Sequence, residues 1–352
     1  MESPRLFRGI LTFSTIGLPV ASVKDMNALA NRVGPLAERL AAPSGVYFRW
    51  SDPSGAEIWL QVNANNELIG MNPHYAGRSA VRVGLTARLP SAGPSEFDGS
   101  FHGWADPAGY APDTGCYPFV FDAPDYQLYE ELSLPARKEV QIAAFAHEIT
   151  AFETVAAYEA SQTGDLKYGS QSFIPSGLFT PAGDSTIPPE ARAIFAGHVL
   201  AADEKINVLT GRAFYWALVE TLGGAYDVVI DSNLLPGVPA VGGVISGSFW
   251  LSGRIICPVS EVIIIGPLMA YRNGRHLGRP PSLSGYCGHG GTFADLRDGR
   301  RTSVAILCRR ALSPARHTAR GCWRCHVTPR WMCSKPMFAV STYFEIMLAG
   351  DC

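Results

Sequence analysis

The sequence has few charged residues and no long, uninterrupted apolar run. Asp, Glu, Lys and Arg make up 17% of its 352 residues, and apolar residues make up 47%. This balance is typical of a globular chain and excludes an intrinsically disordered one. The most membrane-like segment, residues 255–271, is interrupted by Pro258, Glu261 and Pro267. Its uninterrupted stretch is about half of the ~20 residues that a spanning helix needs, so we expect no membrane association.

Cysteine is scarce over most of the chain. Of eight cysteines, only Cys116 and Cys257 precede residue 272. Two distant cysteines do not form a disulfide framework, which predicts a reducing compartment and a cytoplasmic location. Residues 1–21 have arginines before an apolar run, as a secretory signal does, but Thr, Ser, Gly and Pro break that run.

The common catalytic and nucleotide-binding signatures are also missing. Gly242-Gly243 has neither the Lys and Ser/Thr of a P-loop nor the glycine spacing of a dinucleotide fingerprint. His147-Glu148 lacks the second histidine of a zinc-protease motif, and residues 245–248 do not form a serine nucleophile elbow. We therefore expect no cofactor, and a protein that binds or regulates rather than catalyses.

Charge and cysteine are distributed unevenly between the two parts of the chain. From Arg272 onward, 13 basic residues face 4 acidic ones, a net charge of +9, and six cysteines lie in the same segment. The part of the chain before Arg272 carries a net charge of −11. Hydrophobic periodicity also fades past Arg272. Arg, Pro, Ala, Gly, Cys and His have GC-rich codons, so this mixture indicates a frameshifted or non-native tail, poorly structured over residues 257–352.

One pattern in that tail carries recognisable chemistry. Residues 322–326 read C-x-x-C-H, the pattern of covalent haem attachment, in which two thiols bond the haem and a histidine ligates iron. Cys322, Cys325 and His326 are also suitable zinc ligands. A short pattern arises easily in a cysteine-rich segment that has no fold around it, so we do not predict a metal there. The arginines leave phosphate contacts with nucleic acid as an alternative.

The N-terminal part of the chain, residues 1–180, predicts a strand-rich α+β domain. Apolar residues at helical spacing predict an amphipathic helix over residues 23–41, capped by Ser22 and broken or kinked at Pro35. Residues 46–50, 58–62 and 67–71 alternate around turns and predict a three-stranded meander. Further strands are expected at residues 81–89, 100–104, 117–121 and 139–147, followed by a short helix at residues 151–161.

A second domain is expected at residues 190–256, after a linker rich in Pro, Gly and Ser at residues 175–189. Strands are predicted at residues 193–201, 213–222, 225–230 and 241–251, separated by turn residues. Strands at this spacing predict a small antiparallel β-barrel, OB-like or, as an alternative, SH3-like. Nucleic-acid binding through this barrel would need a basic face. The net negative charge of the residues before Arg272 disfavours such a face.

Histidines and acidic residues near strand ends form the candidate catalytic set. Such groups can perform general acid–base chemistry, although Asp before Pro or Gly is also ordinary turn chemistry. We expect His74 in a loop and His198 in a strand. The candidates are His102, Asp106, Asp122, Asp125, His147 and Glu148.

Five stretches resemble pieces of an uncharacterised bacterial protein family, over roughly residues 40–256. They are residues 45–50, 69–77, 115–126, 221–224 and 247–254. The resemblance implies no catalytic residue, and it ends where the composition changes. The leading hypothesis is a non-enzymatic binding or regulatory protein with a small-molecule or protein partner. The alternatives are a hydrolase-like enzyme that uses the six candidates, and nucleic-acid binding.

Overall fold

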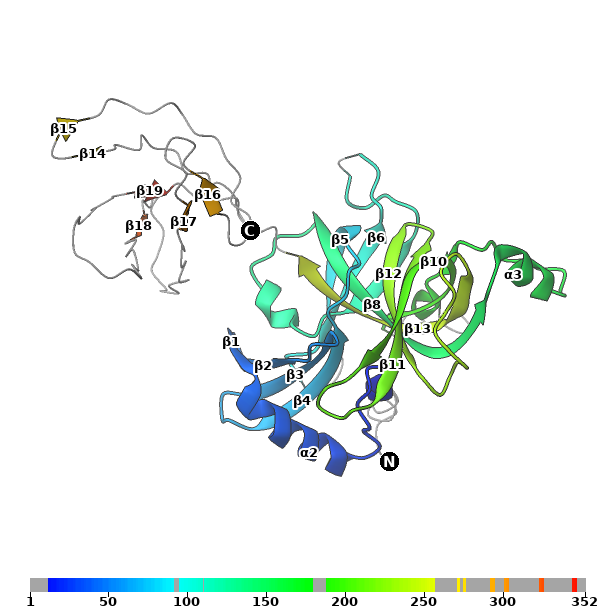
Figure 1. Ribbon diagram of the computed structural model, residues 1–352, viewed down its shortest axis with the longest axis horizontal. Helices are drawn as coiled ribbons and strands as arrows, with labels where there is room; N and C mark the ends of the chain where they lie inside the picture. Colours follow the sequence, from blue (N-terminus) through cyan, green and yellow to red (C-terminus); the bar gives the residue numbers. More distant parts are fainter. Residues whose placement is uncertain are drawn as a thin grey trace. The chain divides into compact units, whose positions relative to one another are not determined.

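The chain divides at Cys257 into two units, Met1–Cys257 and Pro258–Cys352. The computed structural model describes residues 12–91, 95–109, 111–179 and 188–256, together with the backbone of six short strands between residues 271 and 346. Figure 1 shows the first unit as two sheets, with the helix α2 alongside the N-terminal one. Its strands are β1 (Glu38–Ala42), β2 (Gly45–Ser51), β3 (Ala56–Asn63), β4 (Leu68–Tyr75), β5 (Val81–Pro90), β6 (Gly99–Ala105), β7 (Pro118–Asp122), β8 (Ala136–Phe152), β9 (Ser172–Ile174), β10 (Arg192–Ile206), β11 (Ala213–Thr221), β12 (Gly224–Asp231) and β13 (Val244–Ile256).

The described helices are short. Those with described bounds are α2 (Val23–Val33), α3 (Val155–Ser161) and the 3-10 turns η1 (Gly34–Leu36), η2 (Tyr126–Tyr129) and η3 (Ser176–Leu178). No helix in this described part of the chain is long and apolar enough to cross a bilayer. The second unit contributes the strands β14 (Tyr271–Arg272), β15 (Arg275–His276), β16 (Thr292–Ala294), β17 (Arg301–Ser303), β18 (Trp323–Cys325) and β19 (Phe344–Ile346).

The N-terminal helix is shorter than the sequence predicts. Ser22 caps α2, because its hydroxyl accepts a hydrogen bond from the Asp25 backbone N–H at 3.2 Å, as expected. The helix ends at Val33, and Pro35 lies in the 3-10 turn that follows. The chain then becomes the strand β1, so the prediction of helix up to residue 41 is wrong. Proline removes a helical hydrogen-bond donor, and the chain leaves the helix there.

Sheet A contains the predicted meander and extends it by one strand. Its order is β1-β2-β3-β4, and all neighbours are antiparallel. The expected third strand continues through Pro73 to Tyr75, so His74 lies in a strand and not in a loop. β4 is at the edge of the sheet, where proline is tolerated because the outward side of an edge strand needs no backbone donor.

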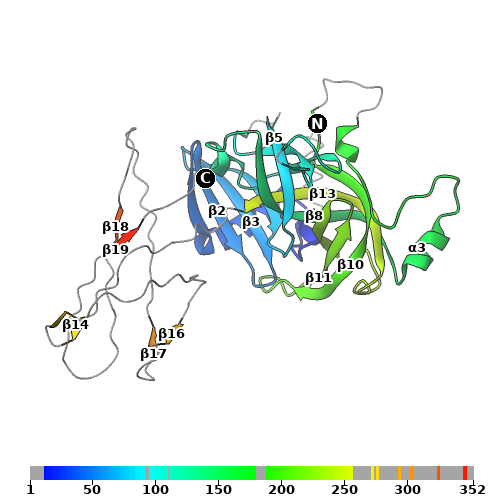
Figure 2. The ribbon, with the colours of Figure 1, turned by 90° about the horizontal axis from the view of Figure 1, so that it is seen from above.

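Sheet B is a nine-stranded mixed sheet. It contains strands from both of the domains that the sequence predicts, residues 1–180 and 190–256. Its order is β11-β12-β8-β5-β6-β7-β13-β10-β9, with additional pairings of β11 with β10 and of β8 with β13. The expected strands within residues 190–256 are present, but they do not form a separate antiparallel sheet. β12 pairs in parallel with β8, and β13 pairs with β8 along its whole length. Figure 2 shows β8 and β13 running side by side, with α3 projecting away from them.

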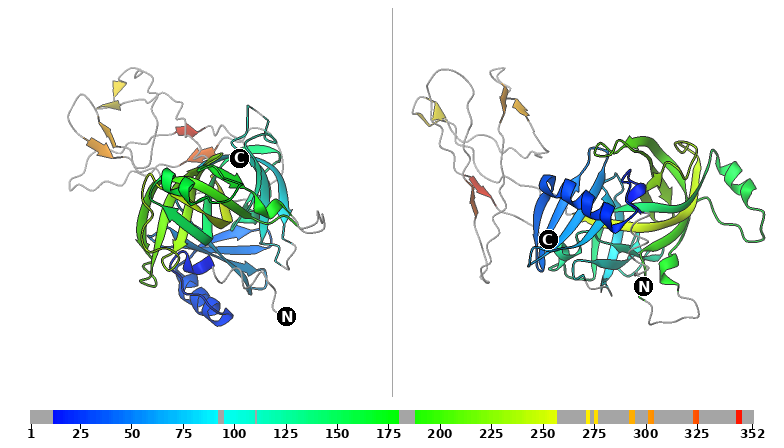
Figure 3. Two further views of the ribbon diagram at one scale, coloured as in Figure 1. Left: turned by 90° about the vertical axis from the view of Figure 1, so that its right-hand side faces the viewer. Right: turned by 90° about the horizontal axis from the view of Figure 1, so that it is seen from below.

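The central part of the strand β8, residues 140–146, is buried on both faces and separates two apolar clusters. Its residues 142, 144 and 146 pack among residues of β5–β7 and β10–β13. Residues 143 and 145 face the other way, toward α2, β3 and β4. Figure 3 shows sheet A lying against sheet B on this second side. A strand covered on both faces reads as a continuous apolar run, and Gln141 is the polar residue within it.

Candidate functional site

Two of the six predicted residues, His102 and Asp106, come from β6 and the turn that follows it. The Nδ1 atom of His102 lies 2.6 Å from the Oγ1 atom of Thr86, and burial lowers the pKa of this half-buried ring. Asp106 has a left-handed backbone, with a φ of 47°, and its carboxylate forms an ion pair with Arg82. The two side chains therefore take part in different interactions.

Asp122 is the last residue of β7, and Asp125 lies three positions later, at the start of η2. Asp122 accepts hydrogen bonds from the Ser100 hydroxyl and from the indole N–H of Trp250, the latter at 2.6 Å. Asp125 is buried, and its Oδ2 atom accepts from Arg254 Nε at 3.0 Å and from the Tyr129 hydroxyl at 2.8 Å. Burial raises the pKa of Asp125, although Arg254 and Tyr129 oppose the shift. Both carboxylates thus connect elements of the fold.

His147 occupies a β-bulge in β8. The ladder with β13 pairs Glu148 with Ser248 but Ala146 with Phe249, so His147 is an extra residue on its strand. Bulges turn a side chain away from its regular direction and are frequent beside binding sites. His147 lines a cavity of about 370 Å³, while the next residue, Glu148, is exposed.

The six predicted residues are divided between separate surroundings. Asp106 lines a larger cavity and His147 a smaller one, and the other four candidates line neither of them. A hydrolase that used these groups together would need them to converge in one pocket. This arrangement does not bring them together.

Sequence reasoning missed a buried polar cluster where sheet A packs on sheet B. The His74 ring lies between two partners, with Nδ1 2.8 Å from Ser252 Oγ and Nε2 2.7 Å from Gln141 Oε1. Because Gln141 Oε1 can only accept, Nε2 carries the proton and Nδ1 accepts from the serine. A serine bonded to an oriented histidine resembles a nucleophile with its base. His74 is 0% exposed and Ser252 1% exposed, however, so no substrate reaches them and their role is structural.

Asp227 belongs to the same cluster, because Gln141 donates a hydrogen bond to its carboxylate. Its carboxylate accepts four hydrogen bonds, all between 2.8 and 2.9 Å, from the backbone N–H groups of Arg78 and Ser79 and from the side chains of Gln141 and Trp216. The donors come from the β4–β5 connection, β8 and β11. One carboxylate on β12 therefore fixes three other parts of the chain.

Glu57 lies at the charged end of the same interface. Its carboxylate accepts from Arg49 Nε at 2.9 Å and from the indole N–H of Trp59 at 3.0 Å, and Arg254 Nη1 is 3.8 Å away. Burial alone would raise the pKa of Glu57. The pKa is nevertheless lowered, because His74, Arg49 and Arg254 favour the carboxylate. Its fully buried charge is thus compensated by neighbouring groups.

The neutral state of His74 is part of this balance. Burial lowers the pKa of the ring from 6.5 to about 4, and the positive charges of Arg254 and Arg49 act in the same direction. Glu57 and the hydrogen bond to Gln141 oppose the shift. At neutral pH the ring is uncharged, which matches the hydrogen-bond pattern derived above.

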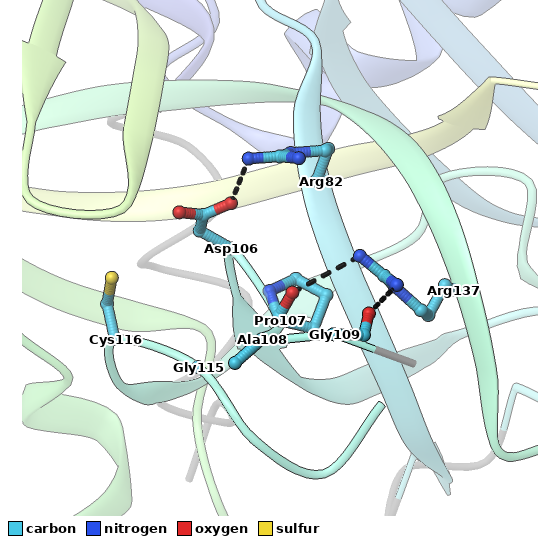
Figure 4. A pocket seen from close by; sticks show the side chains of 8 residues that line it. All are labelled: Arg82, Asp106, Pro107, Ala108, Gly109, Gly115, Cys116 and Arg137. Carbon is cyan, nitrogen blue, oxygen red and sulfur yellow. Dashed lines mark hydrogen bonds and ion pairs between the residues drawn. The ribbon is translucent and has the colours of Figure 1, made fainter. Parts of the chain in front are cut away.

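The larger cavity, of about 770 Å³, lies beside the 106–116 connection between β6 and β7. Figure 4 shows Cys116 on one side of it and Arg82 and Arg137 on the other. Arg82 pairs with Asp106, and Arg137 donates to the backbone carbonyls of Gly109 and Pro107, the latter at 3.2 Å. Cys116 is a free and exposed cysteine. The walls therefore offer two guanidinium groups, one carboxylate and one thiol.

The smaller cavity has a more apolar wall. Ala193, Ile194 and Phe249 line it together with the polar side chains of His147, Ser176, Arg192 and Ser248. In the β10–β13 ladder Ile194 lies directly opposite Ser248, so these two side chains share one face of the sheet. Arg192 also pairs with Glu190 at 2.9 Å. Apolar walls with a few polar groups are typical of small-molecule sites.

No metal site is found in the described ranges, where no group of three or more His, Cys, Asp or Glu residues could hold an ion. The candidates Cys322 and His326 lie outside the described residues, and of Cys325 only the backbone in β18 is described. The haem and zinc hypotheses for the tail therefore stay untested.

Comparisons with known proteins identified no relative of this chain. No family model matches it. No curated protein matches it. No solved structure matches it.

Proposed function

We propose that this chain is a non-enzymatic binding protein, and that the smaller cavity holds a small molecule with an apolar body and an anionic group. The observation that carries the proposal is the bulge that places His147 at a cavity shared with Arg192 and Phe249. Its volume of about 370 Å³ lies within the ~300–1,000 Å³ range of ligand pockets.

The chemistry of the wall supports an anionic ligand. Arg192 is the guanidinium of this cavity, and its side chain is 44% exposed while paired with Glu190. An exposed ion pair contributes only about 0–1 kcal/mol, so a ligand carboxylate can share or replace it. His147 is a second group that can donate to an anion. Ile194, which is 45% exposed, supplies the apolar contact.

Binding is favoured over hydrolysis by the distribution of the acid–base groups. The serine–histidine pair of the buried cluster, Ser252 and His74, is sealed from solvent, and a second described pair, His198 and Ser170, lines neither cavity. The six predicted groups are divided between two cavities, buried or half-buried contacts and the exposed Glu148. Among the residues that line the two described cavities, the hydrolase alternative would use His147 with Ser176 or Ser248.

The experiment compares benzoate with benzamide by ligand-observed NMR on the full chain. Benzoate should bind, and benzamide roughly tenfold more weakly, because a hydrogen bond to a charged group contributes about 1.5–3 kcal/mol. Arg192→Gln should reduce the difference. The matched control is Arg212→Gln, an exposed arginine between β10 and β11, which should keep it. Equal binding of the two probes, or no effect of Arg192→Gln, contradicts the proposal.

A second assay separates binding from catalysis at the same cavity. Incubation with p-nitrophenyl acetate should release p-nitrophenol at the same rate in the native protein and in His147→Gln. Release that falls in His147→Gln but not in His102→Gln would favour the hydrolase alternative instead.

We also propose that the strands of residues 190–256 belong to a barrel-like ring that includes β8. The pairings β10–β11, β11–β12, β12–β8, β8–β13 and β13–β10 support a closed path of five strands. A bacterial origin and a cytoplasmic location remain proposals, and the free, exposed Cys116 supports a reducing compartment.

A further inference from the structure

We propose that the larger cavity is a second binding site, which takes a small molecule through an oxyanionic group, a phosphate or a carboxylate. The proposal rests on the cavity that Arg82 and Arg137 share with Cys116, and on no part of the function proposed above. Its ligand is recognised by two guanidinium groups, which suit planar or tetrahedral oxyanions.

The cavity is built by backbone contacts and not only by flexible side chains. The Asp106 N–H donates to the Arg82 carbonyl at 2.9 Å, and the Cys116 N–H donates to the Ala105 carbonyl at 2.9 Å. These bonds anchor both ends of the 106–116 connection to the strands. Gly84 lets the connection lie against β5, because a Cβ atom there would overlap the Pro112 carbonyl. The wall is therefore formed before a ligand arrives.

The guanidinium groups of Arg82 and Arg137 have more N–H donors than their contacts within the protein use. A guanidinium carries five N–H donors, and the contact between Arg82 and Asp106 is made through Nη2. The Arg82 and Asp106 side chains are 65% and 42% exposed, so their ion pair is weak and exchangeable. Arg137 uses Nη1 and Nη2 to hold backbone carbonyls, which positions it at the cavity wall.

The charged residues that line the cavity favour the binding of an anion. Two guanidinium groups face the single carboxylate of Asp106. Glu139 lies opposite Arg82 in the β5–β8 ladder, but it is exposed and does not line the cavity. An oxyanion inside therefore meets a local excess of positive charge, which raises its local concentration.

Cys116 allows this field to be measured on the full chain. The thiol is alkylated with anionic iodoacetate or with neutral iodoacetamide, and the peptide that contains Cys116 is quantified by mass spectrometry, which separates it from the other cysteines. The ratio of the two rates reports the potential at the cavity and cancels the intrinsic reactivity of the thiol. Inorganic phosphate and succinate are added as probes of the two oxyanion types.

Opposite substitutions should move the ratio in opposite directions. Arg82→Gln should lower the iodoacetate preference about twofold, because it removes a unit positive charge from the cavity wall. Asp106→Asn should raise it by a similar factor, and asparagine tolerates the left-handed backbone at this position. The matched control is Arg39→Gln on β1, an exposed arginine in sheet A, which should leave the ratio unchanged.

Protection identifies the ligand class. Millimolar phosphate or succinate should slow the iodoacetamide reaction at Cys116 in the native protein and not in Arg82→Gln. Protection by phosphate alone assigns a phosphate ligand, and protection by succinate alone assigns a carboxylate. The proposal is overturned if neither anion protects Cys116 at 10 mM, or if Arg82→Gln and Asp106→Asn leave the rate ratio unchanged.

Discussion

The buried His74 should make the stability of this protein depend on pH well above the range in which carboxylates titrate. Its pKa is lowered from 6.5 to about 4, first by burial. In the unfolded chain the ring has its ordinary pKa, so between these two values the unfolded state binds more protons than the native state. The stabilising effect is therefore complete above pH 6.5 and is lost as the pH falls toward 4.

The size of the effect follows from the two pKa values. A shift of one pKa unit corresponds to 1.36 kcal/mol, so the lowered pKa of His74 is worth about 3 kcal/mol in total. About 2.5 kcal/mol of this should be lost between pH 7.5 and pH 4.5. The lowered pKa of Glu57 adds a loss mainly below this window, and the raised pKa of Asp125 acts in the opposite direction. A comparison with a variant cancels the contribution of Asp125, and the contribution of Glu57, whose pKa His74 itself helps to lower, falls mainly below the measured range.

The variant is His74→Gln, which offers one acceptor to Ser252 and one donor to Gln141 but does not titrate. Urea unfolding followed by tryptophan fluorescence gives the free energy of unfolding at pH 7.5, 6.5, 5.5 and 4.5. The loss across this range should be about 2.5 kcal/mol smaller in the variant than in the native protein. The matched control, His198→Gln, replaces a part-buried histidine bonded to Ser170 and should keep the native profile. Parallel profiles for the native protein and His74→Gln would refute the reasoning.

Three further outcomes test the fold. Gly84→Ala should destabilise by roughly 1–3 kcal/mol in thermal unfolding, because its Cβ would overlap the Pro112 carbonyl, whereas Gly237→Ala, with open space around it, should change stability by less than ~0.5 kcal/mol. Asp227→Asn should cost about 2 kcal/mol or more in urea unfolding, because an amide NH₂ must then face two donors in either orientation, and an unchanged midpoint would contradict the role of Asp227 in fixing three other parts of the chain. A chain ending at Ile256 should unfold cooperatively with the native midpoint, and loss of folding would show that later residues are required.

The local elements were largely predictable from the sequence, because alternation and turn residues are local signals. Most strands of both sheets and the cap at Ser22 follow from such patterns, whereas β1 and β9 were not predicted. The end of the predicted meander was misplaced because Asn72-Pro73 is typical of a turn, whereas an edge strand accepts proline. The expected helix over residues 23–41 failed after Pro35, because Leu40 fits a helical face and a strand equally well.

The pairing of distant strands and the buried cluster could not be predicted in the same way. β8 and β13 are far apart in the sequence, and no local pattern specifies that they pair. Gln141 and Asp227 are polar residues within apolar strands, a signal that both faces of those strands are covered. That signal is readable in the sequence, but it does not name the partners. His147 was selected for its residue type, and only the ladder shows that it occupies a bulge.

The buried cluster and the two cavities are made from different residues. Substitutions that affect stability should therefore fall at other positions than substitutions that affect ligand binding. His74, Gln141 and Asp227 face inward between the sheets, where an unpaired polar group would cost about 1–3 kcal/mol. Arg82 and Arg192 are at least 44% exposed, and their ion pairs contribute little to folding. Substitution of either arginine should therefore change ligand binding at its own cavity while the unfolding midpoint stays near the native value. A cavity variant that unfolds would point to a structural role for its arginine, and a variant of the cluster that keeps its midpoint would show that the hydrogen bonds described here do not hold the two sheets together.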